Sequence, residues 1–268
     1  RCQSINPVSL DRIRYFFRSL FRSTSLGHML SFMKTKIRLF VDHPLSEAQL
    51  VHLSRTQAHY IFSVMRKSKG DHIRLFNGKN GEWLAQIDFA RKKQGVVRCL
   101  EITKPQQNPP DVWLMFAPIK KARTDFIVEK ATELGVARIL PLQTDFTNSE
   151  RIRRERLQDH AIGAAEQCGG TFIPKVTDIS RLEKLLSNWP LDRFLLFCDE
   201  EKVGERVETK DLPKGKWAIL LGPEGGFSEK ERKYIHSMQN TFSLSLGPRI
   251  LRADTAAVAA LTLWQNAL

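Results

Sequence analysis

Two glycine-containing segments near the carboxyl end of the chain hold the residues best suited to chemistry. Residues 221–227 read Leu-Gly-Pro-Glu-Gly-Gly-Phe and lie between an apolar run and a helix start. Residues 244–256 read Leu-Ser-Leu-Gly-Pro-Arg-Ile-Leu-Arg-Ala-Asp-Thr-Ala. One such segment alone would be a structural turn between a strand and a helix. Together they predict exposed backbone at the ends of neighbouring strands, where open α/β sheets bind ligands.

The first segment does not have the pattern of a nucleotide phosphate site. It lacks the G-x-x-x-x-G-K-[ST] sequence of a P-loop, and no G-x-G-x-x-G follows a strand. Gly225 and Gly226 instead let a ligand approach the backbone closely, because neither has a Cβ, and Pro223 stiffens the turn. The segment therefore favours a ligand that is held by backbone contacts.

The ordered pair of segments resembles the cofactor knot of the SPOUT-type RNA methyltransferases, and specifically of the RsmE family. That family methylates N3 of a uridine in 16S ribosomal RNA with S-adenosylmethionine (SAM). The resemblance runs from about Lys36 to Leu268 and implies a homodimer whose last helix is threaded through a loop. It implies cofactor contacts from Leu221, Gly222, Pro223, Glu224, Gly225, Gly226, Leu244, Leu246, Gly247, Ile250, Leu251 and Thr255.

Three polar residues of these segments are the predicted catalytic residues: Arg249, Arg252 and Glu224. Uridine N3 carries a weakly acidic proton, so the site must favour the uridine anion, and arginines can stabilise that charge or clamp a phosphate. Either arginine could instead cap a helix or pair with a carboxylate such as Glu224. Glu224 is the nearest candidate base, and it could equally hold the ammonium group of the cofactor.

A proline-rich linker at 104–110 divides the chain into a small front domain at 33–107 and a larger rear domain at 108–268. The front domain is expected to hold strands at 37–41, 72–76, 82–89 and 95–102 and a helix at 47–65, which suggests a compact β-barrel. Residues 59–66 and 70–71 resemble the PUA-like RNA-binding domain of the RsmE family. RNA contacts are predicted for Arg38, Arg66, Lys120, Lys121 and Arg123, although a solvated charged helix would also explain the last three.

The rear domain alternates strands and helices, which favours a parallel α/β sheet. Strands are expected at 112–117, 137–142, 171–176, 193–198, 217–222 and 241–246. Leu182, Leu185, Leu186 and Trp189 form the stripe of an amphipathic helix. A capping box at 228–231 starts the helix after the glycine turn, which is the segment 222–226. Asp254 is expected to cap the last helix at 255–268. Residues 164–169 also resemble the family, as a pocket wall or as core packing.

The composition favours a soluble RNA-binding protein. Lys and Arg total 42 against 29 Asp and Glu, a net charge of +13, which predicts a polyanionic partner. Four scattered cysteines fit a reducing cytoplasm and no disulfide framework. No spacing of Cys or His predicts a metal site, and no apolar run is long enough to cross a membrane.

Residues 1–32 are rich in Arg, Phe and Ser, and they are excluded from the fold prediction as an extension that is disordered or foreign to the native protein. A transit peptide is the alternative. The chain departs from the RsmE pattern at Gly170 and near 144–147, where family arginines are absent. Two other functions remain open: a SPOUT enzyme that methylates ribose 2′-oxygen or a tRNA base, and a non-catalytic RNA-binding assembly factor.

Overall fold

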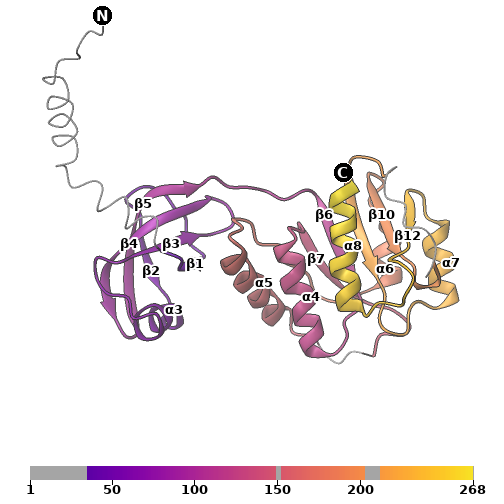
Figure 1. Cartoon of the computed structure of the whole chain (residues 1–268), viewed down its shortest axis with the longest axis horizontal. Helices are drawn as coiled ribbons and strands as arrows, with labels where there is room; N and C mark the ends of the chain where they lie inside the picture. Colours follow the sequence, from indigo (N-terminus) through magenta and orange to yellow (C-terminus); the bar gives the residue numbers. More distant parts are fainter. Residues whose placement is uncertain (1–34, 149–151, 203–211, 268) are drawn as a thin grey trace, which may run out of the picture. The chain divides into compact units, whose positions relative to one another are not determined.

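The computed structural model describes residues 35–148, 152–202 and 212–267. The chain divides into two compact units (Figure 1). The front unit ends at Thr103, and the rear unit starts at Lys104 and includes the turn at 76–82. The division therefore lies at the start of the proline-rich segment, a few residues before the predicted boundary. The predicted extension at 1–32 lies outside the described residues.

The front unit contains a five-stranded sheet in the order β1-β3-β4-β5-β2, with β2 antiparallel to β5. A short helix and one turn of π-helix follow β2. The bounds are β1 (Arg38–Phe40), β2 (Leu50–Leu53), α3 (Arg55–His59), η1 (Tyr60–Val64), β3 (His72–Phe76), β4 (Glu82–Arg91) and β5 (Gln94–Lys104).

The helix predicted at 47–65 is wrong in its first part, because β2 occupies residues 50–53. Side chains of β2 alternate between exposed and buried, with Val51 and Leu53 in the core, which is the period of a strand. The helix starts only after Ser54, whose side chain forms a capping box with Gln57. The predicted strands at 37–41, 72–76, 82–89 and 95–102 are confirmed with small shifts of their ends.

The rear unit is built on a sheet in the order β12-β10-β11-β6-β7-β8, with β9 also paired to β7. The pairs described along this sheet are parallel. The bounds are β6 (Val112–Phe116), β7 (Arg138–Gln143), β8 (Lys175–Val176), β9 (Ser180–Arg181), β10 (Arg193–Cys198), β11 (Lys216–Leu221) and β12 (Thr241–Leu244). The prediction at 171–176 is too long, because the buried Thr171 hydroxyl instead accepts a hydrogen bond from the Gln107 amide of the linker.

Helices cover both faces of this sheet. The helices are α4 (Lys121–Glu133), α5 (Arg154–Cys168), α6 (Leu182–Leu186), α7 (Glu229–Ser237) and α8 (Ala253–Ala267), with a 3₁₀ turn η2 (Glu200–Lys202). Residues of α4, α5 and α8 share one core with alternate strand residues such as Leu114 and Ile219. Residues of α6 and α7 share a second core with the intervening Met115 and Leu220. Each buried strand therefore has apolar side chains on both faces, as expected in a parallel sheet.

Two local predictions about helices need correction. The stripe at Leu182–Trp189 gives a helix of five residues that ends at Leu186, because Pro190 follows closely and the Trp189 indole donates to the Arg193 carbonyl instead. The last helix begins at Ala253, so Asp254 lies in its first turn rather than at the cap. Its carboxylate accepts from the Thr255 amide at 3.1 Å.

The sheet order corrects the expectation that the two glycine segments follow neighbouring strands. β10 lies between β11 and β12 and is parallel to both. After β12 the chain returns across the sheet, so that α8 packs against α4 and β11 (Figure 1). Three carboxyl ends rather than two therefore meet at the predicted ligand site. None of the helices in the described parts of the chain has the length and apolar character needed to cross a membrane.

Candidate functional site

A narrow cleft lies where β10, β11 and β12 end. Its walls come from the three loops that follow these strands and from the first turn of α8. The lining residues are Cys198, Asp199, Glu200, Leu221, Gly222, Pro223, Leu246, Arg249, Ile250, Leu251, Ala253 and Ala256. The two predicted segments are thus brought together, and the end of β10 joins them.

Half of the twelve residues predicted to contact the cofactor line this cleft, whereas Glu224 and Gly225 line a different cavity, described below. Those that line the cleft are Leu221, Gly222, Pro223, Leu246, Ile250 and Leu251, together with Arg249 from the predicted catalytic set. Leu244 is buried at the end of β12, and Thr255 is exposed on α8. Gly247 has a φ of 111°, a conformation that favours glycine, and no atom lies near where its Cβ would be.

The glycine turn has one position that only glycine suits. The Gly226 amide donates to the Pro223 carbonyl at 2.9 Å, which closes the turn, and the φ of Gly226 is 70°. A Cβ at this position would collide with the carboxylate of Glu200. Ser228 then caps α7 and forms the predicted capping box with Glu231, so the helix starts as expected.

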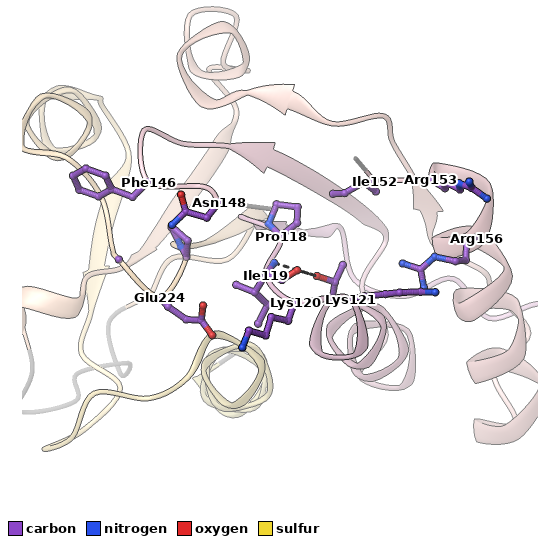
Figure 2. A pocket seen from close by; sticks show the side chains of 13 residues that line it. Pro118, Ile119, Lys120, Lys121, Phe146, Asn148, Ile152, Arg153, Arg156 and Glu224 are labelled. Carbon is purple, nitrogen blue, oxygen red and sulfur yellow. Dashed lines mark hydrogen bonds between the residues drawn. The ribbon is translucent and has the colours of Figure 1, made fainter. Parts of the chain in front are cut away.

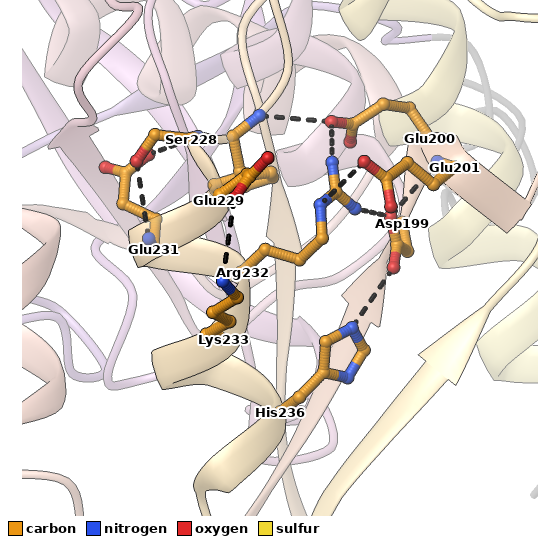
Figure 3. A network of polar contacts seen from close by, with 10 residues as sticks. Asp199, Glu200, Glu201, Ser228, Glu229, Glu231, Arg232, Lys233 and His236 are labelled. Atoms are coloured by element: carbon orange, nitrogen blue, oxygen red, sulfur yellow. Dashed lines mark hydrogen bonds and ion pairs between the residues drawn. The ribbon is translucent and has the colours of Figure 1, made fainter.

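A partly buried ion-pair network supports the acidic wall of the cleft, which is formed by Asp199 and Glu200 (Figure 3). Arg232 of α7 binds the Asp199 carboxylate and, at 2.5 Å, Glu200. Glu200 also accepts from the Phe227 amide at 3.1 Å, and His236 lies 3.3 Å from Asp199. Burial lowers the pKa of Arg232 from its ordinary value. The network therefore holds the carboxylates of Asp199 and Glu200 beside the glycine turn, and both residues line the cleft.

These carboxylates were missed by the sequence analysis, although a signal for them exists. Asp199, Glu200 and Glu201 directly follow a predicted strand, and polar residues after a parallel strand lie at the ligand-binding edge of the sheet. Their proximity to the glycine turn depends on the position of β10 in the sheet. Arg232 belongs to a helix whose surface pattern alone marks it as an ordinary solvated charge.

The predicted catalytic residues have different surroundings. Arg249 and Arg252 are exposed, and across the described ranges neither forms an ion pair. Glu224 is paired with Arg123, whose guanidinium lies 2.8 Å from its carboxylate and 4.0 Å from that of Asp254. Arg123 therefore links α4, the glycine turn and the start of α8. The alternative in which Arg249 or Arg252 pairs with Glu224 is not the arrangement in this structure.

A second, larger cavity of about 810 Å³ lies on the other side of the glycine turn (Figure 2). Its lining residues are Pro118, Ile119, Lys120, Lys121, Thr124, Phe146, Asn148, Ile152, Arg153, Arg156, Pro223, Glu224 and Gly225. We call it the basic cavity, because among the described residues four cationic side chains line it against one carboxylate. Pro223 lines both this cavity and the cleft, so the two hollows share a wall.

The loop that carries the lysines of the basic cavity is held in place locally. The Thr124 hydroxyl accepts from the Ile119 amide at 3.1 Å and donates to the Ile119 carbonyl at 3.0 Å (Figure 2). Lys120 and Lys121, predicted to bind RNA, are exposed next to this anchor. Arg153 and Arg156 line the same cavity and were not among the predicted RNA contacts, although arginines crowd the sequence there.

The other two predicted RNA contacts belong to the front unit. Arg38 lies on β1 and is half-buried. Arg66 is exposed just after η1 and has a φ of 53°, which is unusual for a residue with a side chain. Across the described ranges, no cluster of His, Cys, Asp and Glu has the arrangement of a metal site.

Comparison with known proteins identifies the family. The family model for an RNA methyltransferase domain matches residues 106–265, and that for an RNA methyltransferase PUA domain matches residues 53–98. The ribosomal RNA small subunit methyltransferase E of Rickettsia conorii is 33% identical over 84% of this chain and 93% of its own length. The chain belongs to the ribosomal RNA small subunit methyltransferase E family. The protein of that name from Bacillus subtilis is 30% identical over 84% of this chain and 94% of its own.

Solved structures agree with this membership of the methyltransferase E family. A putative methyltransferase from Legionella pneumophila, solved with bound SAM, has a TM-score of 0.78 and 31% identity over 87% of this chain and 98% of its own. A ribosomal RNA small subunit methyltransferase E from Neisseria gonorrhoeae, also bound to SAM, has a TM-score of 0.77 and 26% identity over 86% and 97%. The predicted fold class, a SPOUT-type α/β domain preceded in the sequence by a PUA-like domain, is confirmed.

Proposed function

We propose that this protein methylates N3 of a uridine in 16S ribosomal RNA with SAM as the methyl donor. Its family membership and its SAM-bound structural relatives support an RNA methyltransferase activity that uses SAM. One observation of the structure supports the proposal most directly: an apolar and acidic cleft and a strongly basic cavity share the wall formed by Pro223. A cofactor and a polyanionic substrate would then meet at the glycine turn.

The residues of the cleft fit SAM chemically. Leu221, Leu246 and Leu251 offer apolar walls for an adenine ring, and the small Ala253 and Ala256 leave room beside α8. The carboxylates of Asp199 and Glu200 suit the positive charges and hydroxyl groups of the ligand. The cleft is only about 70 Å³, so the loops after β11 and β12 have to move apart before a nucleoside can enter. When bound, SAM supplies an activated methyl group on a sulfonium.

Residues of this chain have to activate the uridine by favouring loss of its N3 proton. Removing the N3 proton leaves a negative charge on the base, and a guanidinium close to that charge lowers the cost of its formation. We assign this role to Arg249 and Arg252, which are exposed at the second loop. Glu224 is half-exposed and lies 2.8 Å from the guanidinium of Arg123, and we assign it to accept the N3 proton or to hold a cationic group of the ligand.

The basic cavity is the proposed RNA site. Lys120, Lys121 and Arg153 can each bind a phosphate oxygen around the target nucleotide, whereas Arg156 is already paired with Asp125 at 2.5 Å. Arg38 and Arg66 of the front unit are proposed to bind more distant RNA. From the resemblance to its family we also propose a homodimer that acts in the cytoplasm on the small ribosomal subunit.

The test is transfer of labelled methyl from SAM to undermethylated small ribosomal subunits, followed by mass spectrometry of the nucleosides. The expected product is 3-methyluridine. The Arg252→Ala variant should keep its affinity for SAM in calorimetry and lose methyl transfer, whereas Arg181→Ala, an exposed arginine of β9 outside both sites, should behave as the wild type. A ribose-methylated or other product would favour a different substrate, and SAM binding without transfer would favour an assembly factor.

A further inference from the structure

An aromatic side chain stands in the wall of the basic cavity. Phe146 lies on the loop after β7 and is 46% exposed. Its ring lies at one side of the cavity, beyond Asn148 (Figure 2). Among the described residues that line this cavity, the other large side chains are cationic, acidic or aliphatic, and Phe146 is the aromatic one. Phe146 has no charge to offer a phosphate, so its place in this wall needs another explanation.

The loop that carries Phe146 is anchored at both sides of the ring. The Thr144 amide donates to the Thr147 hydroxyl at 2.8 Å, and the Thr147 amide donates to the Thr144 carbonyl at 3.2 Å. Asp145 accepts from the Ser228 hydroxyl at 2.5 Å. The Asp145 amide donates to Glu231 at 2.9 Å. The loop is thus tied to the cap of α7, directly after the glycine turn, and the backbone that carries the exposed ring is held in position.

Gly225 lies close to the side chain of Phe146. A Cβ at Gly225 would lie 3.3 Å from the Cβ of Phe146, closer than side chains ordinarily approach. Gly225 does not have the positive φ that requires glycine at Gly226. A side chain at 225 would therefore require Phe146 to shift slightly, whereas the backbone conformation at 225 does not itself demand glycine. The glycine turn and the exposed ring form one surface beside Pro223 and Glu224.

We propose that Phe146 stacks on the pyrimidine base of the target nucleotide and thereby selects and orients it. This inference rests on the proposed function. An enzyme that modifies a base edge must take the base out of its stack, and the exposed face of the base then needs a new partner. Aromatic side chains supply that partner in proteins that bind single-stranded RNA. Lys120, Lys121 and Arg153 of the basic cavity would bind the flanking phosphates while the ring of Phe146 covers the base.

The test compares three substitutions of Phe146 with a matched control. Phe146→Ala should lower kcat/KM for 3-methyluridine formation about 5- to 150-fold, the range for loss of one base–aromatic stack. SAM affinity in calorimetry should be unchanged. Phe146→Leu keeps an apolar side chain without a π face and should be impaired nearly as much, whereas Phe146→Trp should remain active. Phe126→Ala, which removes a 39% exposed phenylalanine of α4 outside the cavity, should act as the wild type.

Two results would overturn the inference. Wild-type rates in Phe146→Ala would show that the ring is not used, and wild-type rates in Phe146→Leu would show that apolar packing alone suffices. Affinity for a short uridine-rich single-stranded RNA, measured by fluorescence anisotropy, separates this inference from the proposed function. If the wild type transfers no methyl group but binds this RNA more tightly than Phe146→Ala, the stacking stands and the proposed activity fails. Equal affinities would refute the stacking.

Discussion

Replacing Gly226 with alanine tests whether the glycine turn and the acidic wall of the cleft form one unit. Gly226 is buried and has a φ of 70°, and a Cβ there would collide with the Glu200 carboxylate. That carboxylate is the end of a flexible side chain, so it can rotate away. When it does, it leaves the Phe227 amide and the guanidinium of Arg232.

The cost has two parts. Holding a residue with a Cβ in the left-handed region costs about 1–2 kcal/mol. Loss of the contacts of Glu200 adds about 1 kcal/mol, a modest value because the Glu200 side chain is 33% exposed. Gly226→Ala should therefore lower the free energy of unfolding of the rear unit by about 2–3 kcal/mol. Displacement of one wall of the cleft should also weaken SAM binding at least about tenfold, which corresponds to 1.4 kcal/mol.

Urea unfolding followed by tryptophan fluorescence measures the first effect, and calorimetric titration with SAM measures the second. Gly163→Ala is the matched control, because Gly163 lies in α5 with open space around it. Alanine there should stabilise the protein by about 0.5–1 kcal/mol and leave SAM affinity unchanged. If Gly226→Ala unfolds like the wild type and binds SAM equally well, the turn and the acidic wall are not coupled.

Three further results are expected. Arg123→Ala should slow methyl transfer by freeing Glu224 but cost less than about 1 kcal/mol of stability, because the pair is partly exposed; a large loss of stability would contradict this. At pH 8 iodoacetamide should label the exposed Cys168 and not Cys99, since burial raises the pKa of the Cys99 thiol to about 11; equal labelling would refute it. RNA affinity should fall steeply with salt, and a flat response would argue against phosphate binding in the basic cavity.

Much of the local structure of this protein could be predicted from its sequence. The alternation of strands and helices, the capping box at Ser228 and the two glycine segments were all recognisable, because each depends on residues within a few positions of one another. Prediction failed where two local patterns competed. Residues 50–53 were assigned to a helix because a helix does begin soon after them, at Ser54, and only pairing with β5 makes them a strand.

The composition of the candidate site depended on contacts between distant segments. Parallel strands pair without a local turn, so no short pattern places β10 between β11 and β12. That placement alone brings Asp199 and Glu200 to the cleft and lets Arg232 hold them. Likewise the sequence marked Arg123 as a basic residue, and only the fold pairs it with Glu224. The sequence thus determined which backbone turns were available for a ligand, whereas tertiary packing decided which charged and aromatic side chains surround them, because those side chains come from segments whose pairing is non-local.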